Sequence, residues 1–274
     1  MFDVIGHVIG EGFGFNTALT AAAIAACMLV LWLLSIRLRD ISIVDIFWGP
    51  GFALVALVTH ALSAGIGVDS RRTLVTVLTT LWGLRLGGYL YWRNHGKGED
   101  PRYTAMFRAQ PDPRLHLTTL LKVFLLQGLL IWLISMPVQL AQYLTQPAQL
   151  GWPALAGMAL WVVGFLFETI GDFQLARFRS DPARRGRILD TGLWRYTRHP
   201  NYFGDACVWW GLLLIACDHW IGLLTVFAPL LMTHFLVNIT GKELLEKRMG
   251  SARPGYAEYV ARTSGFFPWP PRSP

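Results

Sequence analysis

Residues 18–34 read ALTAAAIAACMLVLWLL, a stretch without a charged side chain and without a polar helix face. Residues 223–237, LLTVFAPLLMTHFLV, have the same character near the other end of the chain. A helix needs about 20 mostly apolar residues to cross the hydrocarbon core of a bilayer, which is about 30 Å thick. Because a helix on the surface of a soluble protein would keep a polar face, these two stretches predict membrane-spanning helices.

Apolar blocks of this kind recur along the chain. Of the 274 residues, 53% are hydrophobic and only 15% are charged, and the mean hydropathy is +0.41, which is too apolar for an ordinary soluble domain. The blocks that could span a membrane cover residues 17–36, 42–63, 73–92, 117–141, 152–176, 202–217 and 220–240. The third contains Arg85 and the sixth is short, so these two give the weakest signals. We therefore expect an all-α membrane protein with about seven transmembrane helices, in a single domain over residues 1–274.

The basic residues gather in alternate connections between these blocks. Segment 37–41 has two Lys or Arg, 93–116 has five, 177–200 has seven and the tail after residue 241 has six, whereas the opposite side has only Arg71 and Arg72. Because basic loops remain in the cytoplasm, the N-terminus is predicted outside and the C-terminus in the cytoplasm. This placement accounts for the net charge of +7 without a nucleic-acid partner.

The N-terminal residues and the cysteines carry little further signal. Residues 1–16 contain Asp3 and Glu11 but neither Lys nor Arg, so they lack the basic start of a signal peptide, and we expect the first block to remain as a helix. The cysteines, at positions 27, 207 and 217, lie within the predicted spans and lack the spacing of a metal site or a disulfide framework. No metal site is predicted.

One carboxylate lies about one turn into the second block: Asp45, within SIVDIFWGPG at residues 42–51. Ionisable groups inside a membrane are costly and usually functional. Asp45 could instead form a buried ion pair with Arg85, as a fixed strut between helices.

Tyr89 and Tyr91 lie in the cytoplasmic half of the third block, and one of them is expected to face inward, unless both belong to the aromatic belt at the membrane surface.

The segment richest in polar side chains runs from Glu168 to Asp205. Its last part, residues 192–205, reads GLWRYTRHPNYFGD and ends where the sixth block begins. The start of a helix offers free N–H groups to an anion, and Arg198, His199 and Asn201 beside it are suited to phosphate or carboxylate groups. Contact with anionic lipid is the alternative, but it requires only charge and not this order of residues.

Two other polar segments have plainer interpretations. The stretch GEDPRY at residues 98–103 reads as a solvated loop with local ion pairs. Acidic and basic residues alternate over residues 241–248, which is typical of an amphipathic helix on the surface. A transporter would also place polar residues inward along the outer half of its helices, and the sequence shows almost none there.

Several motifs together resemble the bacterial membrane branch of the steroid 5-alpha-reductase family. They cover most of the chain from about residue 42 onward, and they are SxxDxxWGxG at 42–51, GEDxRY at 98–103, GLWRYTRHPNYFG at 192–204 and LEK at 245–247. The resemblance implies a seven-helix reductase that holds NADPH in a cytoplasm-facing cavity. Its reaction would be reduction of the carbon–carbon double bond conjugated to a ketone, typically in a 3-oxo-4-ene steroid. The location it implies is the inner membrane of a bacterium.

The resemblance also suggests roles for individual residues. In animal members a Glu in the second span and a Tyr in the third activate the carbonyl group, which carries over to Asp45 and to Tyr89 or Tyr91, with Trp48 at the substrate. This sequence departs from the animal pattern, because it has Val44 and Asp45 where a Gln-Glu pair is expected. The implied cofactor contacts are Asp172, Arg179, Tyr196, Arg198, His199, Asn201, Tyr202 and Asp205. Arginines among them would suit the 2′-phosphate that distinguishes NADPH from NADH.

The RHPNY run alone, at residues 198–202, is less specific. A similar Arg-His-Pro-x-Tyr motif marks isoprenylcysteine carboxyl methyltransferases and phospholipid methyltransferases, in which it helps to hold S-adenosylmethionine. Their tails often carry paired glutamates near the place of Glu243 and Glu246. A membrane methyltransferase is therefore the alternative function. For both functions we expect a lipophilic small-molecule substrate and membrane lipid as partners, with no obligatory protein partner.

Overall fold

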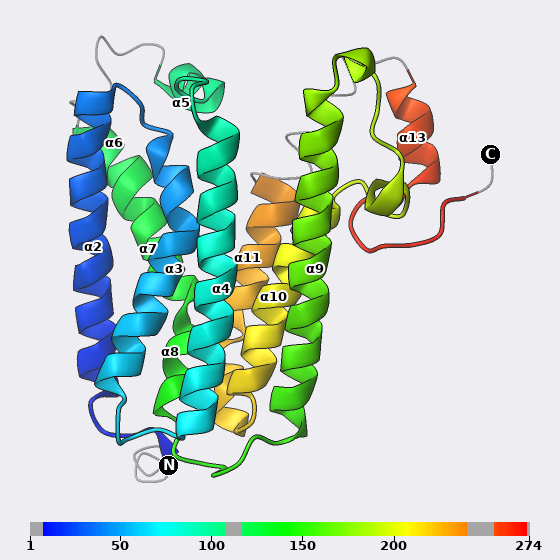
Figure 1. Cartoon of the computed structure of the whole chain (residues 1–274). Helices are drawn as coiled ribbons and strands as arrows, with labels where there is room; N and C mark the ends of the chain where they lie inside the picture. The colour runs from blue at the N-terminus through cyan, green and yellow to red at the C-terminus, as the bar shows by residue number, and fades with distance from the viewer. Residues whose placement is uncertain (1–7, 108–116, 240–254, 273–274) are drawn as a thin grey trace. The chain divides into compact units, whose positions relative to one another are not determined.

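The computed structural model of the chain describes residues 8–107, 117–239 and 255–272 (Figure 1). Regular structure within these ranges is helical, apart from two isolated bridges that pair Ile9 with Leu144 and Thr197 with Ser264. The chain divides into two compact units. Unit 1 comprises Met1–Gly151 and Ala216–Thr225, and unit 2 comprises Trp152–Ile215 and Val226–Pro274. The tail motif at residues 241–248 lies outside the described residues.

Unit 1 is a bundle in which the long helices run side by side (Figure 1). These helices are α2 (Phe13–Leu38), α3 (Ile43–Leu62) and α4 (Asp69–Asn94), and the short α5 (Pro101–Met106) lies in the connection after α4. The next part of the bundle is built from consecutive pieces: α6 (Leu117–Thr119), a π-helical segment (Leu120–Leu125), α7 (Leu126–Ile134) and α8 (Met136–Tyr143). A 3-10 helix at Trp220–Thr225 belongs to the same unit.

Unit 2 contains the long helix α9 (Trp152–Ser180), then α10 (Pro200–Ala216) and α11 (Phe227–His234), which continues as a π-helical segment (Phe235–Ile239). Two 3-10 turns, Pro182–Arg184 and Gly192–Arg195, lie between α9 and α10. The short helix α13 (Tyr256–Arg262) lies near the C-terminus. As the sequence predicted, Pro200 is the first residue of α10, where its missing N–H removes no helical hydrogen bond.

The all-helical membrane architecture expected from the sequence is confirmed, since within the described residues each predicted block is mainly helical. Five helical stretches are long and apolar enough to cross a membrane: Phe13–Leu38, Ile43–Leu62, Leu117–Ile134, Trp152–Ser180 and Trp220–Ile239. The remaining two blocks correspond to α4, which carries several charges, and to α10, which has 17 residues. They are the two blocks whose sequence signal was weakest. Seven spans and their orientation stay predictions.

Glycines allow α3 and α4 to pack closely. A Cβ atom added at Gly49 would lie 2.0 Å from the carbonyl oxygen of Gly83, and one added at Gly83 would lie 2.3 Å from that of Gly49. The ring of Pro50, which lies inside α3, packs against Gly87 in the same way. Because no side chain separates the two backbones, this contact fixes the start of α3, where Asp45 lies, against α4.

Buried polar side chains join α2 and α4 to α8. Asn16 Nδ2 donates to Gln139 Oε1 at 3.0 Å, and Thr76 Oγ1 donates to Gln142 Oε1 at 3.1 Å. This end of unit 1 is the one that the predicted orientation places outside, so the expectation of almost no inward polar residues in the outer half was wrong for this unit. These groups bond to one another between helices, which is how polar side chains stabilise helix packing in a membrane.

Arg71, near the start of α4, forms an ion pair with no exposed area on either side chain. Its Nη2 lies 3.4 Å from Asp218 Oδ2, and its guanidinium also donates to the backbone carbonyls of Leu144, Gln146 and Pro147. The Asp218 carboxylate accepts in addition from the N–H of Gly151 at 3.1 Å. This pair therefore ties the start of α4 to two connecting segments of unit 1.

Candidate active site

Asp45 lies in the first turn of α3, and two side chains from the segment around α5 bond to it. Arg102 Nη2 donates to Asp45 Oδ2 at 2.7 Å, and the phenolic hydroxyl of Tyr103 donates to Oδ1 at 2.6 Å. The partner of Asp45 is thus Arg102, and the alternative of a strut with Arg85 is not the pairing found. A carboxylate, a guanidinium and a phenol therefore meet at the start of α3.

Two further side chains extend this network. Gln127 Nε2 donates to the Tyr103 oxygen at 3.1 Å, and Gln127 Oε1 accepts from the indole N–H of Trp48 at 2.6 Å. Trp48, which was predicted to contact the substrate, therefore positions the Gln127 amide that bonds to Tyr103. Gln127 is the second residue of α7, two positions after the end of the π-helical segment Leu120–Leu125, and such segments frequently occur at functional sites.

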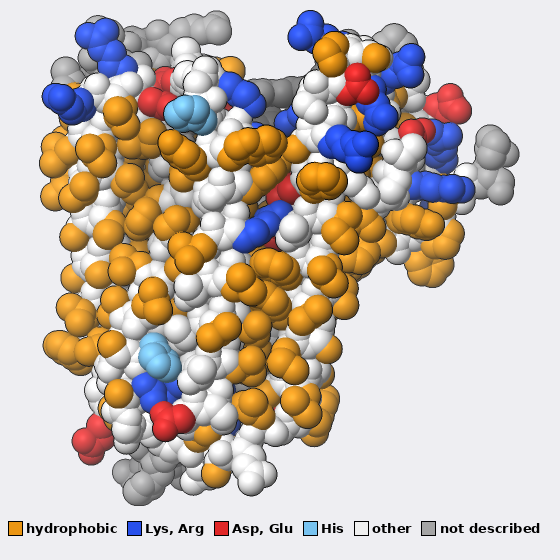
Figure 2. Space-filling view, in the orientation of Figure 1, with side chains coloured by type: hydrophobic (Ala, Val, Ile, Leu, Met, Phe, Trp, Pro, Cys, Tyr) orange, Lys and Arg blue, Asp and Glu red, His pale blue; other side chains and the backbone are white. Residues whose placement is uncertain are grey.

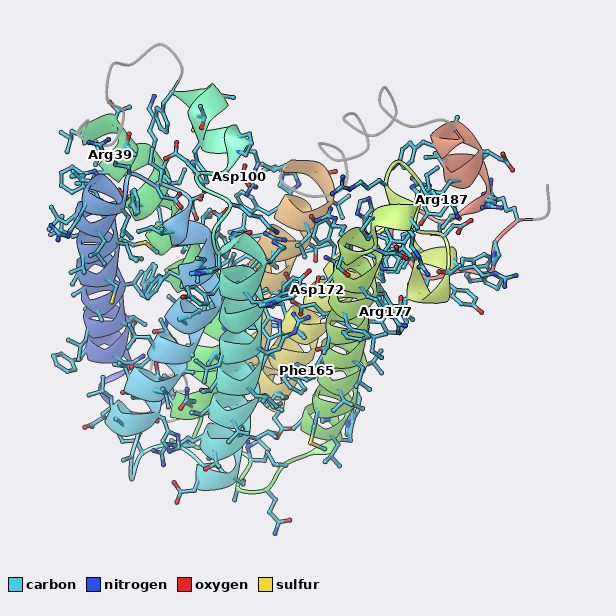
Figure 3. The ribbon with its side chains drawn as sticks, turned by 45° about the horizontal axis from the view of Figure 1, so that its top comes forward. Arg39, Asp100, Phe165, Asp172, Arg177 and Arg187 are labelled. Carbon is cyan, nitrogen blue, oxygen red and sulfur yellow. The ribbon has the colours of Figure 1, made fainter. Side chains whose placement is uncertain are left out.

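The segment that carries Arg102 and Tyr103 is fastened to the start of α3. Glu99 Oε2 accepts from the N–H of Ile41 at 2.9 Å, and Asp100 Oδ1 accepts from both the backbone N–H and Nε of Arg102. Asp100, labelled in Figure 3, also caps the N-terminus of α5. The local ion pair expected in GEDPRY is present, but the expectation of a solvated loop was wrong for Tyr103, which is only 7% exposed.

These contacts set the protonation of the phenol and the guanidinium. Burial raises the pKa of Tyr103 above its usual range, and the charge of Asp45 and the hydrogen bond to it add to this effect. Burial alone would lower the pKa of Arg102, but its hydrogen bonds and the charges of Asp45 and Asp100 raise it overall. Tyr103 is therefore a protonated donor at neutral pH, and Arg102 is a permanent positive charge.

The two tyrosines that the sequence favoured have other neighbours. Tyr89 lies between two cations on the same helix, with Arg85 and Arg93 at 5.6 and 5.8 Å from its ring centroid. Tyr91 is 57% exposed and lies 5.4 Å from the ring of His95. The hydrogen bonds that the structure shows at Asp45 thus come from Arg102 and Tyr103.

In unit 2, the residues predicted for the cofactor cluster where α9 meets the start of α10. Asn201 Nδ2 donates to Asp172 Oδ1 at 3.1 Å, and Asp172, on α9 (Figure 3), is buried. The rings of His199 and Tyr202 stack, with centroids 5.3 Å apart. Asp205 follows one turn into α10 and is partly buried, whereas Arg179 and Tyr196 are exposed.

Arg198 has a role that its sequence context did not indicate. Its Nη1 donates to the carbonyl oxygens of Val260 and Thr263, at 3.1 and 2.5 Å, and its backbone N–H donates to Ser264 O at 2.9 Å. The carbonyls at the end of a helix have no partner within the helix, so the guanidinium satisfies the end of α13. Arg198 therefore fastens the C-terminal segment to the start of α10.

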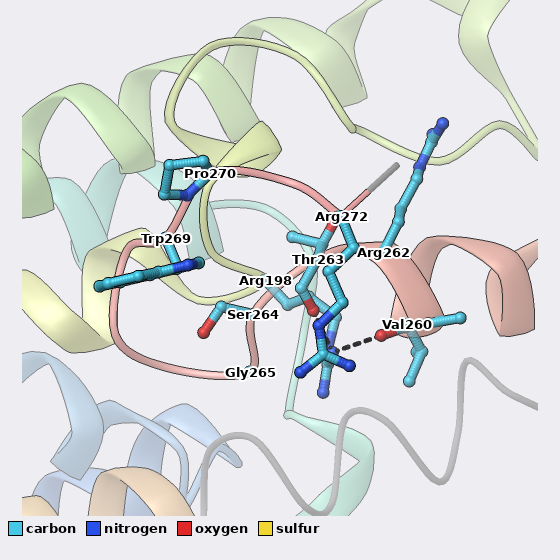
Figure 4. Close-up of a pocket in the computed structure, with 10 residues that line it drawn as sticks. Arg198, Val260, Arg262, Thr263, Ser264, Gly265, Trp269, Pro270 and Arg272 are labelled. Atoms are coloured by element: carbon cyan, nitrogen blue, oxygen red, sulfur yellow. Dashed lines mark hydrogen bonds between the residues drawn. The ribbon is translucent and has the colours of Figure 1, made fainter. Parts of the chain in front are cut away.

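This contact forms one wall of a pocket of about 290 Å³ (Figure 4). The pocket is lined by three arginines and by residues of the turn that follows α13. The arginines are Arg198, Arg262 and Arg272. Arg262 is also paired with Asp190 at 2.5 Å. A polar pocket with three guanidinium groups is suited to phosphate oxygens.

Sequence reasoning missed Tyr103, Gln127 and the two arginines of the tail. Tyr103 belongs to the quoted GEDxRY motif, and its place there is the only signal that could have marked it. Gln127 lies in an apolar block, where an isolated amide is a weak signal of the same kind as Asp45. Arg262 and Arg272 follow no pattern in the sequence.

Together these features define a helical membrane protein with a carboxylate–phenol pair in one unit and an arginine-lined pocket in the other. A family model matches residues 31–263, and the chain belongs to that family, described as protein of unknown function DUF1295. The chain is also similar to "Uncharacterized protein C594.04c" of Schizosaccharomyces pombe, at 28% identity over 266 residues that cover 87% of this chain and 76% of the relative. No solved structure matches the chain.

Proposed function

We propose that the protein is an NADPH-dependent reductase that acts on the carbon–carbon double bond of a conjugated enone lipid. The observation that carries this proposal is the hydrogen bond from Tyr103 to Asp45, in a site that Gln127 and Arg102 complete. The family resemblance makes a 3-oxo-4-ene steroid the first substrate to test. The inner membrane of a bacterium, with the site on the cytoplasmic side, is the location that goes with this proposal.

The residues of unit 1 fit the electrophilic half of such a reaction. When bound, NADPH would supply a hydride to the carbon beta to the carbonyl group, and negative charge would move to the carbonyl oxygen. A Tyr103 hydroxyl that turns from Asp45 to this oxygen would donate a hydrogen bond there, as in an oxyanion hole. Arg102 would meanwhile balance the negative charge of the Asp45 carboxylate, and Gln127 would hold the phenolic oxygen in place through its hydrogen bond. A proton added at the alpha carbon would complete the reduction.

The residues of unit 2 fit an anionic cofactor. Arg198, Arg262 and Arg272 line a polar pocket, and the start of α10 with Asn201 lies in the same unit. Arginine forms bidentate bonds to phosphate oxygens, so these residues would favour NADPH, with its additional 2′-phosphate, over NADH.

Cofactor binding to the purified protein tests this proposal. Calorimetric titration in detergent should give tighter binding of NADPH than of NADH, and NADPH should be consumed when a 3-oxo-4-ene steroid is added. Binding of S-adenosylmethionine in place of NADPH would overturn the reductase proposal and support the methyltransferase alternative.

A further inference from the structure

The C-terminal segment, residues 255–272, is bonded to the rest of unit 2 but leaves two large aromatic side chains uncovered. Its attachment includes hydrogen bonds from Trp269 N to Tyr196 O at 3.0 Å and from the Tyr259 hydroxyl to Trp194 O at 2.6 Å. Phe267 and Trp269 are nevertheless each 70% exposed. Because the backbone around them is held in place, their exposure is a fixed property of this surface.

These aromatic side chains adjoin the apolar surface of the long helices of unit 2. The ring of Phe267 lies 6.1 Å from that of Phe203, in the first turn of α10, and Phe203 lies 5.2 Å from Phe167 of α9. Figure 2 shows hydrophobic side chains that continue from α9 beneath the C-terminal segment, with Lys and Arg on the side beyond them. The surface of α9 that would face lipid thus continues onto this segment.

Exposed cations accompany the aromatic side chains. Arg272 of the segment is exposed, and so is Arg195, which precedes the residue whose carbonyl bonds to Trp269 N. That residue, Tyr196, is itself 43% exposed. Trp and Tyr are enriched at the level of the lipid headgroups, and arginines close to an anionic bilayer are attracted to its surface.

We infer that the C-terminal segment is embedded in the headgroup layer of an anionic bilayer. Phe267 and Trp269 contact the outer part of the acyl chains, and Arg195 and Arg272 contact the negatively charged headgroups. Continuity with the apolar surface of α9 and the charge of the arginines carry this assignment, which does not depend on the proposed function. The segment that supplies one wall of the arginine-lined pocket is therefore itself attached to the membrane.

Site-specific quenching of a fluorescent label tests the depth of the segment. Trp269→Cys, labelled with bimane in full-length protein whose cysteines 27, 207 and 217 are replaced by alanine, is reconstituted into nanodiscs. Lipids with a spin label near the headgroup should quench this label more strongly than lipids with a label deep in the acyl chain. The matched control is Glu258→Cys on the exposed side of α13, which should be quenched by aqueous iodide and not by either lipid. Quenching of the Trp269 label by iodide and not by lipid would overturn the inference. So would a label that is protected from iodide only in nanodiscs that hold two copies of the protein, because a second copy and not lipid would then cover it.

The lipid charge is tested by changing the nanodisc composition. Lipid quenching at Trp269→Cys should increase when phosphatidylglycerol is added to phosphatidylcholine, and Arg195→Gln should reduce this increase. Equal quenching in both compositions would overturn the role of the arginines.

Discussion

The phenolic oxygen of Tyr103 lies 2.6 Å from Asp45 Oδ1, although the two residues are 58 positions apart in the chain. Tyr103 has one hydroxyl hydrogen, and in this arrangement it points to the carboxylate. Its oxygen accepts from Gln127 at the same time, so the position of the phenol is fixed from two sides. A donor fixed in this way loses little freedom when a carbonyl oxygen replaces the carboxylate as its acceptor.

Replacing Tyr103 by Phe should remove this donor and leave most of the packing intact. We expect the rate of enone reduction per folded molecule to fall by a factor on the order of 10²–10³, as at other oxyanion sites, with NADPH affinity nearly unchanged. Asp45→Asn should also lower the rate, and the double variant should lose less than the sum of the two effects on the activation free energy, because Asp45 acts through the hydrogen bond that it accepts from Tyr103. Turnover and calorimetric binding measured on the same preparation check this.

Tyr89→Phe is the matched control for Tyr103→Phe. The Tyr89 ring keeps its contacts with Arg85 and Arg93 in this variant, because cation–π contacts need no hydroxyl. Because the hydrogen bonds at Asp45 come from Arg102 and Tyr103, we expect turnover to fall less in Tyr89→Phe than in Tyr103→Phe. A large loss of turnover in Tyr89→Phe, together with normal turnover in Tyr103→Phe, would show that Tyr89 of α4 is the hydrogen-bond donor in place of Tyr103.

Arg198→Ala should loosen the C-terminal segment even without a cofactor. The variant leaves the carbonyls of Val260 and Thr263 without their charged donor, a loss on the order of 1–3 kcal/mol. Residues 255–272 should therefore be cleaved faster in limited proteolysis. Arg272→Gln provides the comparison, since it removes a pocket cation that makes neither of these bonds. In detergent, where no bilayer contacts Arg272, this variant should weaken NADPH binding with unchanged proteolysis. Equal proteolysis of Arg198→Ala and the wild type would contradict the assigned contact.

Gly49→Ala should destabilise unit 1 severely. The added methyl group would lie 2.0 Å from the carbonyl oxygen of Gly83, so α3 and α4 would have to separate, at a cost of about 1–3 kcal/mol or more. Gly88→Ala is the control on α4, because an added Cβ there meets nothing within 4 Å. Thermal unfolding in detergent should give a lower midpoint for Gly49→Ala only.

The Asp100–Arg102 contact should make stability depend on pH in the acid range. Burial alone would raise the pKa of Asp100, but the hydrogen bonds and the charge of Arg102 outweigh it and lower the pKa. The unfolded chain therefore binds the proton first, at its ordinary pKa of about 3.9, so this stabilisation is complete above that pH and is lost as the pH falls below it. Thermal unfolding of the wild type and of Asp100→Asn from neutral to acid pH should differ less at the acid end. A constant difference would contradict the lowered pKa.

The elements of the fold were predictable from the sequence because membrane helices depend on local composition. Asp45 could also be found this way, since a carboxylate within an apolar run is itself unusual. Its partner could not, because the phenol that meets Asp45 depends on how the segment around α5 folds back onto α3 and not on helical spacing. For the same reason Arg198 was predicted as an anion ligand from its residue type, whereas its bonds to Val260 and Thr263 follow from the path of a tail far along the chain.

The ion pair between Arg71 and Asp218 has a consequence for the order in which the protein is made. The ribosome synthesises Arg71 early, but its carboxylate partner belongs to Ala216–Thr225, which follows α9 and nearly all of α10 in the chain. Removing one partner of a buried pair is strongly destabilising, because the remaining charge is uncompensated. Unit 1 therefore cannot be completed during synthesis until most of unit 2 has emerged, and a nascent chain that stops at Gly151 retains an arginine without its counter-ion.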